Sequence, residues 1–413
     1  MTAWNPSVFR EYDIRGIAGK DLSAEFAYQL GLGYEELVRG TPPTAGRKRF
    51  TVSVARDCRL SSDEYAEAII RGLTDAGIDV IDIGLCPSPL SYFSVFHFDL
   101  DGAVMITGSH NAADYNGFKI CWGRTTIHGE KIQRLKKILS KPLSPSTKKG
   151  DLTSREIIPA YLDLVNKNAR RPLKRKKVVL DAGNGTAATV APPLFELLGA
   201  QVIPLYCTLD GRFPNPHPAP TGPANLKVLV ETVLMERADF GIAFDGDSDR
   251  IGLVDERGRI IYGDELLVLF ARSVLKEHPG ATIISEVKSS HRLYQDIEAR
   301  GGRGIMWKTG HSLIKAKMKE TGALLAGEMA GHVFFADRYF GYDDAIYAAM
   351  RVFEIASQHD GPLSSLLSDL PPTHATPEIR VECVEEHKFQ LVESVKADFK
   401  GQGIKLNDID GVR

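Results

Sequence analysis

The sequence predicts an α/β protein with three related domains, because one supersecondary plan recurs three times along the chain. Each copy is a strand, a helix that ends at a glycine, and a second strand, which together form a βαβ unit. The first strands are expected at residues 51–55, 177–181 and 281–286, the second strands at 78–83, 201–205 and 304–307, and the helices at 61–76, up to 198, and at 290–300. Copies spaced by roughly 100–130 residues fit separate domains and are too far apart for a solenoid.

Length and composition are those of a globular protein with several cores. The chain has 413 residues, of which 43% are hydrophobic and 25% charged, and its formal net charge is −2. That charge argues against a general nucleic-acid or acidic-membrane surface. The five cysteines form no CxxC pair, so we expect neither a disulfide framework nor a zinc site. The sequence has no run of 18 apolar residues and no apolar leader, so we expect a cytoplasmic protein without a membrane partner.

Domain boundaries are expected in polar stretches between the copies. Residues 141–149 are rich in Pro, Ser and Lys and read as a linker, and residues 154–168 read as a helix that crosses into the second domain. The expected domains are 1–150, 151–257 and 258–372, followed by the start of a fourth at 373–413. Within this last stretch, residues 378–384 are typical of a strand and residues 388–400 of a helix.

Three aspartates follow an apolar strand at residues 239–244. They stand at alternate positions, as Asp245, Asp247 and Asp249. Carboxylates so close together repel one another in a partly dry site unless a cation lies among them. Oxygen ligands favour Mg²⁺ or Ca²⁺ over a softer metal. Mg²⁺ takes about six oxygen ligands, so water and a phosphate are expected at its remaining positions.

Two other interpretations of these aspartates are an EF-hand loop and a solvated acidic turn without a metal. D-x-D-x-D opens an EF-hand loop, and Glu256 falls at the twelfth position, but Arg250 stands at the sixth, where the sharp turn normally needs glycine. Both flanks, residues 239–244 and 251–255, read as strands where an EF-hand has helices. The apolar strand that runs into the loop argues against a merely solvated turn.

A serine stands in a small-residue turn after another buried strand, residues 102–106. The turn reads Thr107-Gly108-Ser109-His110-Asn111, and its glycine lets backbone N–H groups approach a ligand closely. Taken alone, Ser-His-Asn in a turn is more often plain turn chemistry than catalysis. A cation bound beside Ser109 is expected if this serine carries a phosphoryl group.

Further polar candidates follow other expected strands. Glu328 and His332 stand after the apolar strand at residues 323–326, where a carboxylate suits sugar hydroxyls and a histidine suits proton transfer. Positive charge near strand ends comes from Lys119, Lys288, Lys308 and His311. Each lysine alone is more often a solvated surface residue, and a histidine alone is often a core residue. Open α/β sheets nevertheless bind ligands at the carboxyl ends of their strands, where these residues are expected.

Together these motifs resemble the α-D-phosphohexomutases, most closely the bacterial phosphomannomutase/phosphoglucomutase branch. The match lies in T-G-S-H-N around Ser109, D-G-D-S-D-R from Asp245, G-E-M-A-G-H around Glu328, and Y-D-I-R-G from Tyr12. Residues 9–16 alone read as an edge strand and a turn. The resemblance implies three mixed-sheet α/β domains of one fold around a central cleft, together with a fourth, α+β domain.

The resemblance also implies roles for individual residues. Ser109 is the expected phosphoserine, and Mg²⁺ is expected on Asp245, Asp247, Asp249 and a phosphoserine oxygen. Charge neutralisation or proton movement at the phosphoryl group is expected of Arg15, Lys119, Arg250 and His332, with Lys119 and His332 as the acid–base pair in an order left open. The expected substrate contacts are Tyr12, Lys288, His311, Glu328, Met329 and His332.

The implied activity is the interconversion of hexose 1-phosphate and hexose 6-phosphate. Phosphoserine donates its phosphoryl group to the free hydroxyl, and the hexose 1,6-bisphosphate turns round and returns the other group to Ser109. Glucose 1,6-bisphosphate is the expected activator, hexose phosphates are the expected partners, and the protein is expected to be a monomer. Met329 favours mannose and glucose substrates over glucosamine phosphate.

Two departures from the family pattern bear on activity. Ala330 replaces the serine of the family's E-x-S-G-H loop, which removes about one hydrogen bond, roughly 0.5–1.5 kcal/mol. The Arg/Ser/Thr-rich loop of the fourth domain, which grips the non-reacting phosphate, is not found before Arg413. The chain is therefore expected to be either a truncated piece of a longer mutase, which we favour, or a natural short form. In both cases we expect it to bind Mg²⁺ but to be a poor mutase. The alternatives left open are a metal-dependent sugar phosphatase that uses the same phosphoserine and a non-catalytic sugar-phosphate-binding form.

Overall fold

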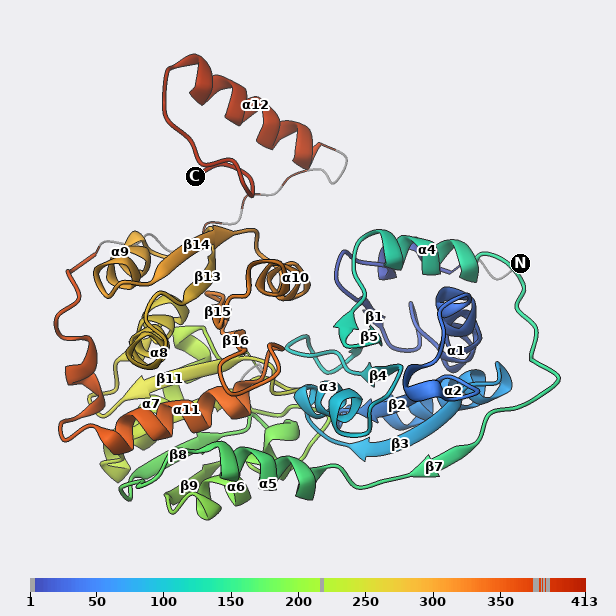
Figure 1. Cartoon of the computed structure of the whole chain (residues 1–413), viewed down its shortest axis with the longest axis horizontal. Helices are drawn as coiled ribbons and strands as arrows, with labels where there is room; N and C mark the ends of the chain where they lie inside the picture. The colour runs from blue at the N-terminus through green and yellow to red at the C-terminus, as the bar shows by residue number, and fades with distance from the viewer. Residues whose placement is uncertain (1–3, 216–218, 374–378, 380, 382, 384–386) are drawn as a thin grey trace.

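Three sheets follow one another along the chain, each flanked by helices (Figure 1). The computed structural model describes residues 4–215, 219–373, 379, 381, 383 and 387–413, and these three sheets lie within those ranges. In Figure 1 the first sheet and its helices occupy the right side of the molecule, and the other two sheets occupy the left. The expected architecture of three similar α/β units is confirmed.

The helices and strands divide among these units in chain order. The first unit holds β1 (Ile14–Ile17), α1 (Ala24–Val38), β2 (Thr51–Arg56), α2 (Ser62–Asp75), β3 (Asp79–Leu85), α3 (Ser88–His97), β4 (Gly102–Ile106), β5 (Tyr115–Trp122), β6 (Thr125–Thr126), α4 (Glu130–Leu139) and β7 (Leu152–Ser154). The second holds α5 (Ile158–Asn168), β8 (Lys177–Asp181), α6 (Ala191–Leu197), β9 (Gln201–Leu205), α7 (Pro223–Glu236), β10 (Phe240–Phe244), β11 (Ile251–Asp255) and β12 (Ile260–Ile261). The third holds α8 (Gly263–Glu277), β13 (Thr282–Glu286), α9 (His291–Ala299), β14 (Arg303–Trp307), α10 (His311–Thr321), β15 (Leu325–Gly327), β16 (Val333–Phe335) and α11 (Ala345–Gln358), and α12 (Lys388–Gly401) follows. None of the described helices has the length and apolarity needed to cross a membrane.

The three sheets share one strand order. Apart from the edge strand β1, the strands of each unit are counted from β2, β8 and β13. The first strand then pairs in parallel with the second and the third, and the third pairs antiparallel with the fourth. The shared orders are β5-β4-β2-β3, β11-β10-β8-β9 and β16-β15-β13-β14. The repeat seen in the sequence is therefore a repeat of topology. Consequently, the hairpin loop between the third and fourth strands has the same place in every unit.

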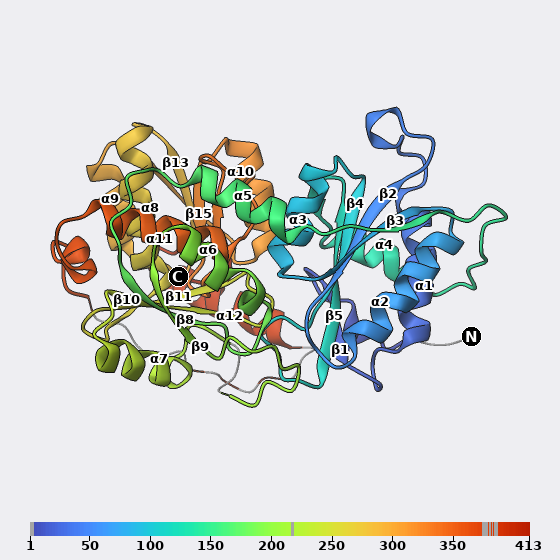
Figure 2. The ribbon, with the colours of Figure 1, turned by 90° about the horizontal axis from the view of Figure 1, so that it is seen from below.

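The first sheet is buried on both faces. Along β4, Ala103 and Met105 belong to the core on the α3 side, while Val104 and Ile106 belong to the core on the α1 and α2 side. Figure 2 shows α3 and the pair α1 and α2 on opposite sides of this sheet. A strand covered on both faces reads as a continuous apolar run, which is the pattern that predicted it.

The N-terminal segment forms the edge strand expected from residues 9–16. β1 lies at the end of the first sheet and pairs antiparallel with β5. The helix expected from residue 154 was wrong at its start, because Leu152–Ser154 form β7, which pairs with β3. The helix α5 begins only at Ile158, and Pro159 stands in its first turn, where its missing N–H costs nothing.

The last described segment contains the helix expected at residues 388–400, which the structure has as α12. Of the strand expected at residues 378–384, residues 378, 380, 382 and 384 lie outside the described residues. In Figure 1, α12 stands apart from the three sheets. The turn that follows it reaches the third unit, where Thr309 N donates to Asp410 Oδ2 (2.8 Å) and Arg413 Nη1 donates to Ser289 O (2.8 Å).

Candidate active site

The three loops that carry the predicted motifs occupy the same position in the three units. Each is the hairpin loop between the third and fourth strands, and we name them the serine loop (residues 107–114), the aspartate loop (245–250) and the glutamate loop (328–332). Ser109 Oγ lies 3.1 Å from Asp245 Oδ2, and Arg250 forms a β-bridge with His332. The repeated topology therefore brings together residues that are far apart in the sequence.

The serine loop presents a buried hydroxyl to the aspartate loop. Ser109 is only 2% exposed and has a φ of 49°, in the left-handed region. Its Oγ donates to Asp245 Oδ2 and lies 3.4 Å from His110 Nδ1. Burial, followed by the charges of Arg250 and Arg15, lowers the pKa of His110 to about 2. His110 is therefore neutral near pH 7, and the serine oxygen faces a carboxylate.

The aspartate loop forms a buried cluster of oxygen ligands. Asp245, Asp247 and Asp249 are each at most 1% exposed, and one carboxylate oxygen of each lies within 4.8 Å of the others. Lys119 Nζ lies 2.5 Å from Oδ2 of both Asp247 and Asp249. The Oδ1 atoms of these two aspartates are buried without a hydrogen-bond partner. Orphaned carboxylate oxygens in an all-oxygen cluster fit a hard divalent cation such as Mg²⁺.

Positive charge balances this cluster only in part. Burial, followed by the charges of Asp249 and Asp247, raises the pKa of Asp245 well above its ordinary value. Burial also opposes the ionised form of Asp249, but the charge of Lys119 overcomes it and the pKa of Asp249 is lowered. Burial opposes the charge of Lys119, yet Asp247 and Asp249 raise its pKa. Lys119 therefore stays charged, and a divalent cation would supply the charge that Asp245 still needs.

The glutamate loop is tied to the loop before α10 by two buried carboxylates. Glu328 Oε1 accepts a hydrogen bond from Gly310 N (2.6 Å), and burial raises the pKa of Glu328. Glu286 Oε1 accepts a hydrogen bond from Met329 N (2.7 Å), while its Oε2 accepts one from Thr309 Oγ1. The two loops that were expected to contact substrate are therefore held in one fixed arrangement.

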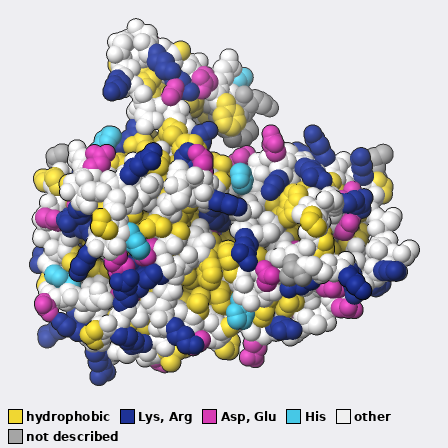
Figure 3. All heavy atoms as spheres, in the orientation of Figure 1, with side chains coloured by type: hydrophobic (Ala, Val, Ile, Leu, Met, Phe, Trp, Pro, Cys, Tyr) yellow, Lys and Arg dark blue, Asp and Glu magenta, His cyan; other side chains and the backbone are white. Residues whose placement is uncertain are grey.

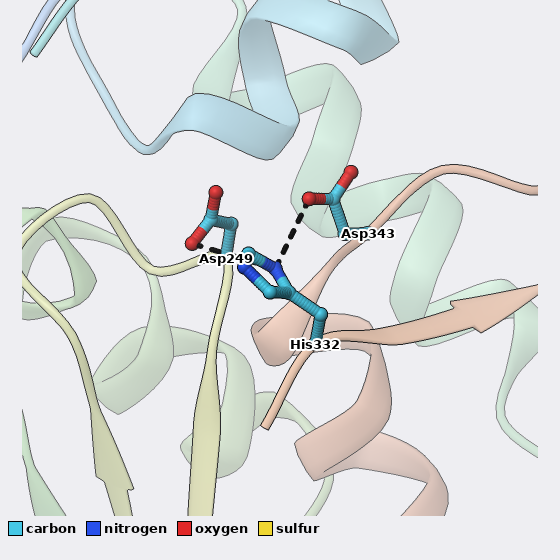
Figure 4. Close-up of side chains that lie close together, drawn as sticks. All are labelled: Asp249, His332 and Asp343. Carbon is cyan, nitrogen blue, oxygen red and sulfur yellow. Dashed lines mark ion pairs between the residues drawn. The ribbon is translucent and has the colours of Figure 1, made fainter. Parts of the chain in front are cut away.

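His332 lies between two carboxylates and an arginine. Its Nδ1 is 3.1 Å from Asp343 Oδ2 and 3.8 Å from Asp249 Oδ1, as the dashed lines in Figure 4 mark. Its Nε2 accepts a hydrogen bond from Arg250 Nε (3.0 Å). This pattern assigns the ring proton to Nδ1, which faces Asp343, and leaves the lone pair on Nε2.

His311 and Tyr12 extend the row of rings that begins at His332. The ring of His311 stacks on that of His332 with centroids 5.5 Å apart, and Tyr12 meets His311 edge-on at 5.9 Å. Burial, followed by the charge of Lys315, lowers the pKa of His311 well below its ordinary value. Burial and then the charge of Glu11 raise the pKa of Tyr12 to about 12, and its hydroxyl donates to Thr309 O (2.9 Å). Both rings are therefore uncharged near pH 7.

Arg15 connects the edge strand β1 to the serine loop. Its Nη1 donates to Asn111 Oδ1 (2.6 Å), and its Nη2 forms an ion pair with Asp13. Burial opposes its charge, but Asp13, Asp247 and Asp249 together raise the pKa of Arg15. The N-terminal motif thereby supplies a permanent positive charge beside Ser109.

A cavity of about 180 Å³ lies between the loops. It is lined by Arg10, Tyr12, Asp13, Arg15, Ser109, Lys119, Asp249, Arg250, His311 and His332. The structure therefore gathers most of the predicted site residues around one space. The predicted site residues outside this lining are Asp245, Asp247, Lys288, Glu328 and Met329. The side chain of Lys288 is 57% exposed, with Nζ 3.4 Å from Glu286 Oε2. On the face drawn in Figure 3, Lys and Arg side chains are spread widely and do not gather in one patch.

Three buried residues at the site were missed by the sequence analysis. Arg59 Nη2 donates to Ser109 O (2.8 Å), Glu286 holds the glutamate loop, and Asp343 pairs with both His332 and Lys315. Each is a single charged residue outside the four motifs. Arg59 and Glu286 do share one signal, since each stands at or just after the end of the first strand of its unit.

Three domain families of phosphoglucomutase/phosphomannomutase match the chain. The α/β/α domain I model matches residues 6–144, domain II matches 159–258 and domain III matches 262–374. A phosphomannomutase/phosphoglucomutase of Pseudomonas aeruginosa is 47% identical over 410 residues, which cover 98% of this chain and 86% of that protein. A phosphoglucomutase of Neisseria gonorrhoeae is 43% identical over 420 residues, which cover 100% of this chain and 89% of that protein.

Comparison of the fold with solved structures leads to the same family. A crystal structure of a phosphoglucomutase/phosphomannomutase family protein from Burkholderia thailandensis has a TM-score of 0.91 and 40% sequence identity, and the match covers 100% of this chain and 88% of that one. Domain matches, full-length relatives and fold therefore agree. This chain belongs to the phosphoglucomutase/phosphomannomutase family of α-D-phosphohexomutases and is a phosphohexomutase, an isomerase.

Proposed function

We propose that the protein interconverts the 1- and 6-phosphates of mannose and glucose through a phosphoserine at Ser109. The observation that carries this proposal is the 3.1 Å contact between Ser109 Oγ and Asp245 Oδ2, at the edge of a buried carboxylate cluster. A serine in this place can carry a phosphoryl group whose oxygens reach a cation held by the aspartates. Relatives named phosphomannomutase/phosphoglucomutase support these substrates.

Asp245, Asp247 and Asp249, together with an oxygen of phosphorylated Ser109, would hold Mg²⁺. The unpartnered Oδ1 atoms of Asp247 and Asp249 support this assignment. When bound, the ion supplies positive charge to the transferring phosphoryl group and to the serine oxygen.

The residues of the chain itself then provide positioning and charge, which are the main requirements of phosphoryl transfer. Lys119, Arg15 and Arg250 line the cavity beside Ser109 and stabilise negative charge on the phosphoryl oxygens. Because its raised pKa keeps Lys119 charged, we assign acceptance of the hydroxyl proton to His332 Nε2. Substrate binding is assigned to Tyr12, Lys288, His311, Glu328 and Met329.

Each half-reaction moves one phosphoryl group and one proton in opposite directions. The free hydroxyl of the hexose phosphate attacks phosphorus and its proton passes to His332. The bond between phosphorus and Ser109 Oγ breaks, and Oγ takes up a proton from Lys119, the other member of the acid–base pair; the reverse transfer returns both protons. The net products are hexose 1,6-bisphosphate and the serine hydroxyl. The bisphosphate then turns round, and the reverse transfer from its other phosphate restores phosphoserine and gives the isomeric monophosphate.

The mass of the intact protein tests the carrier role. Incubation with glucose 1,6-bisphosphate and Mg²⁺ is expected to add one phosphoryl group to the wild-type chain and none to Ser109→Ala. Ser140→Ala is the matched control, because Ser140 is an exposed serine at the end of α4, and it should gain the group as the wild type does. Turnover of glucose 1-phosphate by Ser109→Ala at the wild-type rate would refute the proposal.

Two other functions could use part of this site, and the same protein and substrates distinguish them from the mutase. A phosphatase that uses Ser109 would release inorganic phosphate in step with loss of the sugar phosphate. A non-catalytic binding protein would take up no phosphoryl group and convert no substrate. The mutase instead conserves total sugar phosphate and depends on a bisphosphate to prime it.

A further inference from the structure

A fully buried arginine, Arg59, lies behind the serine loop, between β2 and α2. Its side chain and that of Asp57 both have 0% exposure. We propose that Arg59 is the positioning residue of the phosphoryl carrier: its guanidinium fixes the backbone around Ser109 and does not itself bind phosphate. This inference rests on the proposed function of Ser109 and deepens it.

All five N–H groups of the guanidinium have acceptors. Nε donates to Asp57 Oδ2 (3.1 Å). The other four N–H groups donate to main-chain carbonyl oxygens in and just after the serine loop, at Ser109 (2.8 Å), Asn111 (2.7 Å), Ala112 and Tyr115 (2.9 Å). A lysine has three donors and no planar fork, so it cannot reproduce this set. Because no donor is left over, Arg59 has none to offer a phosphate oxygen.

The serine loop is also confined sterically on two sides. A Cβ on Gly108 would lie 2.5 Å from Arg59 Cζ, and a Cβ on Gly246 would lie 2.7 Å from Ser109 O. Phe213 of the second unit covers the guanidinium, with Arg59 Cζ 4.9 Å from its ring centroid. The backbone of Ser109 therefore touches the arginine of its own unit and a glycine of the aspartate loop.

This confinement explains how Ser109 keeps an unfavourable backbone conformation. Its φ of 49° is one that L side chains rarely adopt, and such conformations persist only where the surroundings over-determine them. The carbonyl of Ser109 is bound by Arg59 Nη2, while its N–H donates to Thr107 Oγ1 (2.8 Å). In this conformation Oγ lies 3.1 Å from Asp245 Oδ2, within reach of the aspartate loop.

The other two units use the same position of the fold for the same purpose. Between β8 and α6, Thr186 N donates to Gly246 O (3.0 Å), and Thr186 Oγ1 lies 3.0 Å from Ser248 Oγ. At the end of β13, Glu286 accepts the N–H of Met329. In every unit, residues at or after the end of the first strand therefore support the hairpin loop, and Arg59 is the residue that does so for the serine loop.

Arg59→Lys tests the proposal, because it keeps the charge and removes the fork. A displacement of about 1 Å at a reacting atom costs about 100-fold in rate, so we expect kcat for glucose 1-phosphate to fall about 100-fold while KM changes less than about threefold. Amide hydrogen exchange over residues 108–116 should speed up by about tenfold or more. Arg56→Lys is the matched control, since Arg56 pairs with Asp63 and Asp82 and should leave all three quantities unchanged.

The results that would overturn the proposal are distinct from one another. Wild-type kcat and exchange in Arg59→Lys would remove the positioning role, and a large rise in KM at unchanged kcat would mean that Arg59 binds the substrate phosphate. If Arg59→Lys does not fold, Gly108→Ala presses a methyl group against the guanidinium, and wild-type kcat and exchange in that variant would equally overturn the proposal. Failure of the phosphoserine proposal shows separately, as absence of phosphoryl uptake by the wild type, because the exchange measurement does not depend on turnover.

Discussion

At the residue scale, Lys119 stands where the aspartate cluster most needs a cation. Its Nζ is 2.5 Å from one oxygen of Asp247 and one of Asp249, and it comes from β5 of the first unit. Removing one partner of a buried ion pair leaves the other charge uncompensated, at a cost of about 3–5 kcal/mol. Lys119 and a divalent ion are therefore two means of neutralising one set of carboxylates.

Lys119→Met is expected to make the protein depend more strongly on Mg²⁺ for stability. Without the ion, we expect the free energy of unfolding to fall by about 3 kcal/mol, because the buried carboxylates of Asp247 and Asp249 lose their ammonium partner. Added Mg²⁺ should raise the melting temperature of this variant more than that of the wild type, as calorimetry can measure.

The control for this comparison is Lys131→Met. Lys131 lies on the helix α4, with its Nζ 4.6 Å from the ring centroid of Trp122, and contacts no carboxylate of the site. Its Mg²⁺-dependent shift should equal that of the wild type. Equal shifts in Lys119→Met and the wild type would contradict the idea that the lysine and the ion neutralise the same charges.

At the element scale, α1 and α2 cross at two glycines. A Cβ on Gly72 would lie 2.1 Å from Tyr28 O, and a Cβ on Gly31 would lie 2.7 Å from Ile69 O. These are backbone atoms of the facing helix, which cannot move aside as a flexible side chain can. The close approach therefore depends on having no side chain at either position.

Gly72→Ala is expected to destabilise the first unit by about 1–3 kcal/mol, because the added methyl group must push the helices apart. Chemical denaturation monitored by circular dichroism measures this loss. Gly401→Ala in α12 is the control, since its Cβ would meet no atom within 4 Å, and it should be neutral or slightly stabilising. Equal stability of Gly72→Ala and the wild type would show that the two helices can repack at no cost.

The sequence predicted the strands of the repeated βαβ units and the strands before the motif loops because their signals are local, but it did not predict β5 or β7. The runs at residues 102–106 and 251–255 match β4 and β11, since a buried strand carries its own apolar pattern. The shared strand order was beyond such reasoning, because pairing between strands leaves no trace in either strand alone. Arg59 and Asp343 were missed for a related reason: each acts on a loop elsewhere in the chain, and neither has a motif of its own.

At the scale of the whole molecule, the three units share one continuous core. A single cluster of buried apolar side chains runs from Ala55 to Leu367 and includes residues of all three sheets. Aromatic contacts join α3 of the first unit to the loop before α11, with ring centroids of Phe96 and Phe340 4.6 Å apart and those of Tyr92 and Tyr342 5.4 Å apart. The loops that form the active site are therefore positioned by packing between units as well as within them.

A buried carboxyl group links the second and third units. Asp344, which caps α11, accepts hydrogen bonds from Tyr161 of α5 (2.8 Å) and from Tyr339 (2.7 Å). Burial nevertheless raises the pKa of Asp344 to about 6, because these neutral donors do not replace the water that its charged form loses. Ionisation of this group therefore opposes the packed arrangement of the two units.

Asp344→Asn is expected to change how stability depends on pH. The pKa of this carboxyl group is about 6 in the folded state and about 4 in the unfolded state, so between these values the folded state binds more protons. The group therefore does not change the free energy of unfolding below pH 4, and it lowers that free energy increasingly as the pH rises through 6. The difference in unfolding free energy between the variant and the wild type should therefore move in favour of the variant by about 2–3 kcal/mol from pH 4 to pH 8. Denaturant titrations at both pH values measure this difference. Asp163→Asn is the control, because Asp163 is an exposed carboxylate on α5 that pairs with Lys167, and the difference for this variant should change little with pH. A difference that stays constant with pH, or that moves in favour of the wild type, would mean that Asp344 is already ionised in the folded protein.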